Sequence, residues 1–296
     1  MSRTLKADFY QVVDANDRPA RLEEALQTIA ALPEEERYLI VGKNPVRLHH
    51  ASRNGLQWEG ELLRIRMDVT PLRANLIGGL KPFELDEDEG LGEETAFLFD
   101  ARTQVLVLQR NRIGVSATAA AYYFQNRAGL NNILFLRPVL RRDAVMRLDR
   151  LRQVRKLDVR FAGVRNPEAL RTDRSVAEMV DVLTEFQAPS AAITLSMGHK
   201  KGSLNVDTVR RFVQKITGFS AENDQPVTKL EISGTAEDEQ VDVFDLINYN
   251  LVEAVTVEPD AGRNVSYARR RAFLRTSWAE NREWLDQMFL DNQANV

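Results

Sequence analysis

The sequence predicts an α+β protein with mixed, largely antiparallel sheets, interspersed helices and a long C-terminal helix. Segments with helical spacing of apolar residues intermingle with short alternating segments, without the regular rhythm of a parallel βαβ fold. The dipeptide Asn54-Gly55 separates two strand-like segments, and it favours a tight antiparallel hairpin because both turn positions need a positive φ. The last apolar-periodic segment, residues 266–290, is long enough for a terminal helix.

The N-terminal half is predicted to contain strands and two helices. Residues 22–30 place apolar side chains at helical spacing before Pro33, and Ser116 is an N-cap candidate for a helix that ends near Gly129. Residues 70–93 predict a loop with a short helix, and Pro138 places its strand at a sheet edge. The predicted strands are 5–13, 37–42, 46–52, 57–67, 95–100, 104–111 and 133–140.

The C-terminal half alternates helices and strands. Asp143 is a candidate N-cap for a short helix, and the next strand, 155–163, alternates apolar with charged residues. The polar segment 164–174 predicts a boundary between two domains, residues 1–165 and 166–296. Further elements follow in order: helix 175–186, strand 190–198, helix 205–218, strand 227–234 and a mixed stretch 241–259 before the terminal helix.

Composition excludes several classes of protein. The 296-residue chain has no cysteine, which rules out disulfides, thiolate nucleophiles and zinc fingers. No apolar run reaches the roughly 18 residues of a membrane span and the first residues lack a signal sequence, so we expect a cytoplasmic protein without direct membrane insertion. Only His49, His50 and His199 offer imidazole, and no two have helical i, i+4 spacing, which argues against a transition-metal site. We expect no metal and no other cofactor, and an all-carboxylate magnesium site is the alternative left open. His49 and His50 are interpreted as strand residues, with one ring packed and one exposed.

Charge is strongly segregated along the chain. The net charge is −3, but residues 137–174 hold 12 basic and 5 acidic residues, a net of +7, which leaves −10 for the rest. Residues 263–275 contain five arginines and no acid, whereas acid is concentrated in 83–94 and 221–245. This distribution says more about partners than the sum does.

The loop "SMGHKKGSLN", residues 196–205, is the best candidate phosphate contact. Its glycines permit a tight turn, and Asn205 or Ser203 can cap the following helix. Lys200 and Lys201 then stand near the positive end of that helix, where phosphate is favoured, while His199 has no visible catalytic partner. Arg210 and Arg211 follow in the helix.

Two arginine-rich segments extend the candidate surface. Lys156 and Arg160 project from one face of their strand at a spacing of about 6.6–7 Å per two residues, comparable with that of duplex phosphates. A run of basic residues at the start of the C-terminal helix is unfavourable with the helix dipole and indicates that an anion is welcome there. The further candidates in these segments are Arg141, Arg142, Arg155, Arg269, Arg270 and Arg271.

The order of segments resembles the RexA proteins of lambda-type phage exclusion. The resemblance covers about residues 86–217, from "DEGLGEETAFLFD" through "RPVLRRDAVMRL" and "VRKLDVRF" to "AAITLSMGHKKGSLNVDTVRRFVQKI". It implies a dimeric DNA-binding protein of phage defence, related in fold to the RdgC DNA clamp, that senses DNA intermediates and signals to an effector. The matching positions are Lys200, Lys201, Arg210, Arg211, Arg141, Arg142, Lys156 and Arg160, and the overall acidity is the main departure.

We therefore expect a non-enzymatic, homodimeric protein that binds double-stranded DNA largely without sequence preference and that can act as the sensor of an anti-phage or abortive-infection system. No nucleophile elbow, Walker loop, zincin helix or kinase motif is present. One alternative is a metal-dependent nuclease or toxin-like effector with magnesium carboxylates within 86–100 or 231–245. Another is a protein-interaction subunit that docks a partner effector of a defence complex.

Overall fold

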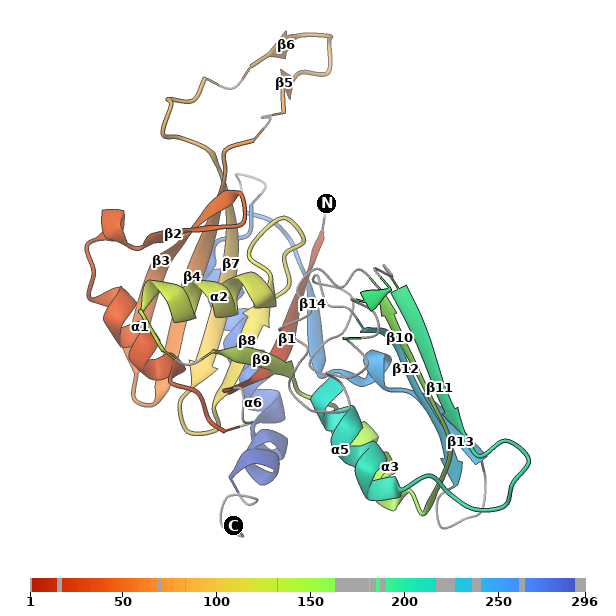
Figure 1. Cartoon of the computed structure of the whole chain (residues 1–296). Coiled ribbons are helices and arrows are strands. Elements are labelled where there is room, and N and C mark those ends of the chain that lie inside the picture. The colour runs from red at the N-terminus through yellow and green to blue at the C-terminus, as the bar shows by residue number, and fades with distance from the viewer. Residues whose placement is uncertain are drawn as a thin grey trace. The chain divides into compact units, whose positions relative to one another are not determined.

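The chain forms two compact units (Figure 1). The first contains residues 1–8, 19–135 and 253–296, and the second contains residues 9–18 and 136–252. The computed structural model describes residues 2–14, 18–68, 71–82, 84–131, 133–162, 181, 185–186, 190–216, 227–235, 241–260 and 264–290. The boundary predicted at 165/166 and most of the helix predicted at 175–186 lie outside these ranges.

The larger sheet has the strand order β14-β1-β8-β7-β4-β3-β2, and β9 pairs with β1. The central pairs β3–β4, β4–β7 and β7–β8 are antiparallel, so the predicted α+β class is confirmed. Its strands are β1 (Arg3–Val13), β2 (Tyr38–Val41), β3 (Asn44–Asn54), β4 (Gln57–Arg66), β7 (Leu91–Asp100), β8 (Val105–Gln109), β9 (Phe135–Pro138) and β14 (Val252–Val257).

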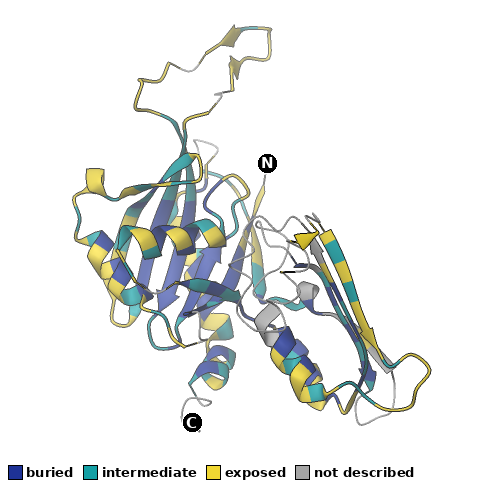
Figure 2. Cartoon of the chain, viewed as in Figure 1, coloured by how far each residue is buried: buried dark blue, intermediate teal, exposed yellow. Residues whose placement is uncertain are grey.

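Three helices pack on this sheet, α1 (Leu22–Ala30), α2 (Ala117–Arg127) and α6 (Tyr267–Phe289). Helix α1 contacts α2 and β3, while α6 contacts β4, β7 and β8, and Figure 1 shows them on opposite faces. Alternation in the strands places Phe97 and Leu62 in the core, each at most 1% exposed, and Phe97 meets Phe124 of α2 edge to face at 5.7 Å. Figure 2 shows this sheet as largely buried.

The connection between β4 and β7 forms an arm, defined here as residues 71–82. The short helix expected between residues 70 and 93 is absent from the described part of this segment, and two-residue strands β5 (Arg73–Ala74) and β6 (Leu80–Lys81) pair instead. Asn75 explains the hairpin, because its side-chain oxygen accepts hydrogen bonds from the N–H groups of Ile77 and Gly79 at 3.0 and 2.9 Å. This local turn competes with helix formation.

The second unit has a four-stranded sheet with the order β11-β10-β12-β13 and antiparallel pairing throughout. Leu157 and Val159 of β10 are at most 2% exposed and belong to the core beside the helices, as their alternation predicts. The other face carries Lys156, Asp158 and Arg160. The elements are α3 (Arg142–Arg150), β10 (Gln153–Ala162), β11 (Ser190–Ser196), α5 (Val206–Ile216), β12 (Val227–Thr235) and β13 (Val241–Asp245).

Two of the three helix N-caps that the sequence predicts are confirmed. Ser116 caps α2 by accepting a hydrogen bond from Ala119 N at 3.2 Å, and Asn205 caps α5 by accepting from Thr208 N at 2.9 Å. The prediction for Asp143 was wrong, because Arg141 is the N-cap residue of α3. Asp143 lies in the first turn and pairs with the Arg141 guanidinium at 2.8 Å. Among the described helices, none is both long and apolar enough to cross a bilayer.

Candidate metal centre

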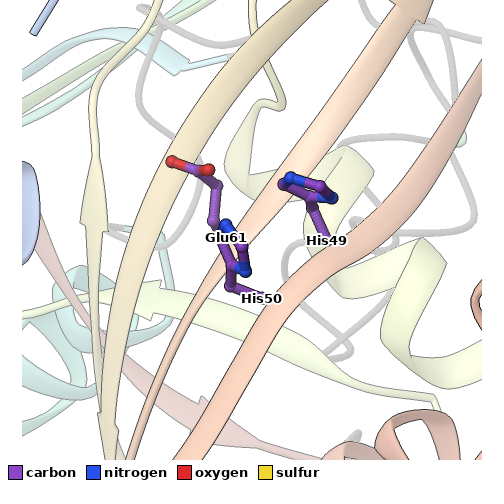
Figure 3. Close-up of side chains that lie close together, drawn as sticks. All are labelled: His49, His50 and Glu61. Carbon is purple, nitrogen blue, oxygen red and sulfur yellow. The ribbon is translucent and has the colours of Figure 1, made fainter. Parts of the chain in front are cut away.

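A β-bulge in β3 brings two consecutive histidines together. The register with β4 shifts between Leu48, which faces Leu62, and His50, which faces Glu61, so His49 is the extra residue. In a regular strand His49 and His50 would point to opposite faces, but a bulge redirects one of them. Their ring centroids lie 4.2 Å apart (Figure 3), and His49 is partly buried while His50 is exposed.

Glu61 of β4 completes a group of three metal-ligand side chains. One ligand atom from each of His49, His50 and Glu61 lies within 4.8 Å of the other two. The two imidazoles are partly accessible, whereas Glu61 is only 1% exposed. The set therefore combines a buried carboxylate with two nitrogen donors that solvent can reach.

Each of the three side chains is held by a neighbour that leaves ligand capacity free. His49 Nδ1 lies 3.2 Å from Glu34 Oε1, which leaves its Nε2 available. The His50 ring stacks on Tyr267 of α6 with centroids 4.9 Å apart. Arg270 of α6 donates to Glu61 Oε1, and its other terminal nitrogen donates to Glu94 Oε2 at 2.6 Å. Carboxylate–histidine pairs of the Glu34–His49 kind are the usual way in which proteins orient a metal-binding imidazole.

Burial and charge determine the protonation of the cluster. Desolvation, followed by the neighbouring His49, lowers the pKa of His50, which favours the neutral imidazole. Burial raises the pKa of Glu61, and the Arg270 guanidinium opposes that shift by stabilising the carboxylate. Desolvation also raises the pKa of Tyr267 to about 12, so its hydroxyl is protonated at neutral pH.

Helix α6 uses its arginines to dock onto the sheet. Arg270 is 5% exposed and also donates to Val265 O at 2.7 Å, so it is not available to a phosphate. Arg275 binds Glu59 of β4 through two nitrogens, and Arg271 lies 3.9 Å from the same carboxylate. Arg269 pairs with Asp260 at 3.2 Å. The anion predicted for the start of this helix is therefore supplied by the protein's own carboxylates.

Two of the predicted DNA contacts in the second unit support the backbone. The Arg155 guanidinium donates to the carbonyls of Gly198, Lys200 and Gly202 at 2.7–3.0 Å and so holds the loop 198–202. Arg210 donates to the carbonyls of Leu148, Asp149 and Leu151 and thereby satisfies the C-terminal end of α3. These guanidinium groups have structural roles that the sequence pattern does not reveal.

The charged face of β10 is internally paired. Asp158 accepts hydrogen bonds from Thr194 at 2.9 Å and from Lys156 and Lys229 at 3.1 Å each. These three donors lower the pKa of Asp158 to about 2. Lys156 was expected to point outward as one of a row of free cations, but it binds the carboxylate of Asp158 instead.

The remaining predicted contacts stay accessible to different degrees. Arg141 pairs with Asp143 and lies over the Tyr249 ring at 5.3 Å. The accessible side chains are Lys200, Lys201, Arg211, Arg142 and Arg160. Nine of the twelve predicted residues belong to the second unit, while Arg269, Arg270 and Arg271 belong to the first.

The acidic stretches proposed for magnesium do not assemble a site in the described chain. Within 86–100, Glu94 pairs with Arg270 and Glu93 lies 3.6 Å from Arg66. Asp100 accepts hydrogen bonds from the N–H groups of Arg102 and Thr103 and closes the turn after β7. Part of 231–245 lies outside the described residues. Among the residues that the structure describes, the one group of three metal-ligand side chains is His49, His50 and Glu61.

These features define a two-unit α+β protein with a His-His-Glu cluster under its C-terminal helix. The chain belongs to the family of unknown function DUF6731, whose match covers residues 1–283. No curated protein matches the chain.

Proposed function

We propose that this protein binds one divalent transition-metal ion through His49, His50 and Glu61. The observation that carries the proposal is the bulge, which places two imidazoles beside a buried carboxylate with every ligand oriented by a second residue. Two imidazoles and one carboxylate suit zinc and neighbouring first-row ions better than magnesium. Such a site departs from the sequence-based expectation of no metal, and its nitrogen-rich ligands differ from the carboxylates of the alternative magnesium site.

Charge and geometry are compatible with a bound dication. Glu34, Glu61 and Glu94 contribute three negative charges, and Arg270 and Arg47 contribute two positive ones, since Arg47 lies 3.5 Å from Glu34. Bonds to zinc of about 2.0–2.2 Å place any two ligand atoms at most about 4.4 Å apart. The three ligand atoms here, all within 4.8 Å of one another, are close to that spacing. Three protein ligands leave a coordination position for water or a substrate, as in catalytic rather than structural zinc sites.

The test is a zinc titration of the purified protein by calorimetry and by competition with a chromogenic chelator. One zinc ion per chain is expected, and His50→Ala is expected to weaken binding by more than about 100-fold. Glu34→Gln, which removes charge from the residue that orients His49, is expected to cost about 10-fold. Cobalt substitution supplies a spectroscopic readout that does not depend on any activity.

The third histidine provides a matched control. His199 lies in the loop after β11 in the second unit, so His199→Ala is expected to leave zinc affinity unchanged. Intact tryptophan fluorescence shows that each variant still folds. Equal zinc affinity of the wild type and the His50→Ala protein would refute the site.

A second candidate function, binding of double-stranded DNA, is favoured by the loop at 198–202. Arg155 pulls three loop carbonyls inward, while Lys200 and Lys201 remain exposed beside the start of α5. We expect Lys200→Glu with Lys201→Glu to reduce fluorescence-anisotropy binding of every duplex sequence alike. Lys43→Glu, at an exposed turn in the first unit, is the matched control. Lack of any binding at about 50 mM salt would exclude this function without affecting the metal proposal.

A further inference from the structure

The arm exposes apolar side chains that nothing in the described part of its own chain covers. Leu76 and Ile77 at its tip are 106% and 95% exposed, and Leu72 and Leu80 are 57% and 67% exposed. Soluble proteins rarely present such a cluster without a use for it. Figure 1 shows the arm extending away from the sheet that carries it.

Hydrogen bonds within the arm itself hold the turn at its tip. Besides the two bonds to its side chain, Asn75 donates its own N–H to Gly79 O at 3.1 Å, and Gly78 has a φ of +101° that suits glycine. Arg73 and Lys81 face each other directly across the two short strands. The arm therefore offers an apolar tip between two cations, and binding it costs little conformational entropy because the turn is already formed.

The same chain contains a groove of matching chemistry in the first unit. It runs between β14 and α6 and has a volume of about 500 Å³. Apolar side chains and three carboxylates line it, among them Val255, Val257, Phe273, Glu253, Glu258 and Glu280. The one lining arginine, Arg269, is already engaged by Asp260 and by Glu258 O. The groove is thus apolar inside and acidic overall.

We infer that the arm of one copy docks in the β14–α6 groove of a second copy. Leu76 and Ile77 would fill the apolar part, and Arg73 and Lys81 would meet the carboxylates of Glu253, Glu258 and Glu280. A reciprocal exchange of two arms gives a closed two-fold dimer in which each copy donates one arm and receives one. Strand β14 ends the order of the sheet, so the acceptor groove lies at a sheet border.

Light scattering during gel filtration tests this interface. The wild type is expected at twice the chain mass of 33.7 kDa, and Leu76→Asp with Ile77→Asp is expected at the chain mass. These side chains make no core contact, so the variant is expected to fold. The matched control, Ile113→Asp with Ile133→Asp, changes two half-exposed side chains elsewhere in the same unit and is expected to stay dimeric.

Cross-linking tests which surfaces meet. The chain has no cysteine, so a protein with Ile77→Cys and another with Val255→Cys can be mixed without background. A disulfide is expected between the two different variants and not within either variant alone. Charge exchange adds a third measurement, since Glu280→Lys is expected to weaken the dimer and Lys81→Glu in the same chain to restore it.

Several results would overturn the inference. A monomeric wild type, or a dimer that survives the double aspartate change at the arm tip, excludes arm exchange. Binding of the wild-type monomer to vesicles of phosphatidylcholine and phosphatidylserine, lost in the same variant, would assign the arm to a lipid surface instead. Failure of the dimer leaves the zinc titration unaffected, because His49, His50 and Glu61 all belong to one copy.

Discussion

The hydroxyl of Tyr123 holds β3 one residue before the bulge, which makes Tyr123→Phe the most informative perturbation of the fold. It accepts a hydrogen bond from Leu48 N at 2.9 Å and donates one to Arg37 O at 2.6 Å. Burial raises the pKa of Tyr123 to about 12, so the group remains a donor at neutral pH. Phenylalanine keeps the ring and removes only the oxygen.

The size of the stability loss depends on which of the two former hydrogen-bond partners can bond to water instead. Leu48 is 0% exposed, so its N–H stays unsatisfied after the change, whereas Arg37 is only partly buried and its carbonyl can turn to solvent. One buried donor without a partner costs about 1–3 kcal/mol. Because phenylalanine keeps the ring, the change opens no cavity that would add to this cost. We therefore expect the free energy of unfolding of the first unit to fall by about 2 kcal/mol.

Urea unfolding followed by tryptophan fluorescence measures this change in the right part of the chain. Trp58, Trp278 and Trp284 are the three tryptophans, and all of them belong to the first unit. Tyr122→Phe is the matched control, because Tyr122 is 51% exposed on the same helix and its change is expected to stay within about 0.5 kcal/mol. Equal stability of the two variants would refute the role of the hydroxyl. If Tyr123→Phe weakens zinc binding and Tyr122→Phe does not, the Tyr123 hydrogen bonds also help to hold the bulge that positions the histidines.

Three further changes test separate parts of the structure. The pKa of Asp158 is lowered to about 2 from an ordinary value of 3.8, so its contribution is full above pH 4 and is lost as pH falls through 2. The stability difference between the wild type and Asp158→Asn, followed by circular dichroism, should therefore be constant from about pH 5 to 8 and shrink below about pH 4. A Cβ at Gly60 would lie 2.4 Å from both His50 O and the Phe97 ring, so Gly60→Ala should destabilise the first unit by about 1–3 kcal/mol in urea. Arg155→Met removes the bonds to three loop carbonyls and should speed tryptic cleavage after Lys200 and Lys201, whereas Arg211→Met should not.

Local patterns predicted most of the elements but not their assembly. Apolar spacing located α1 and α6, and alternation located β10 with its buried Leu157 and Val159. The composition of the two units cannot be predicted from local patterns, because residues 9–18 group with 136–252 while residues 253–296 group with the N-terminal part. Such groupings depend on contacts between segments far apart in sequence, which neither composition nor periodicity encodes.

The candidate site was missed because its geometry depends on one extra residue. Strand alternation separates His49 from His50, and helical spacing does not apply to them, so neither pattern predicts a pair. The bulge becomes visible only in the register of β3 against β4. A signal was nevertheless present in "QWEGELLRIRM", where Glu59 and Glu61 lie two residues apart, on one face of a predicted strand, and require partners if that face is buried.

The arginines of α6 are those partners, and this connects the fold to the proposed site. A row of arginines on a helix can bind an anion from outside the protein or carboxylates of the protein itself. Here the buried carboxylates of Glu59 and Glu61 bind the arginines of α6. Because Arg270 binds Glu61 while Tyr267 stacks on His50, the docking of α6 sets the positions of two of the three proposed ligands. Loss of the Arg270 guanidinium alone would leave Glu61 buried without its counter-charge, which raises its pKa further and favours the protonated carboxyl. Metal binding and the docking of the C-terminal helix should therefore be coupled, and each should stabilise the other.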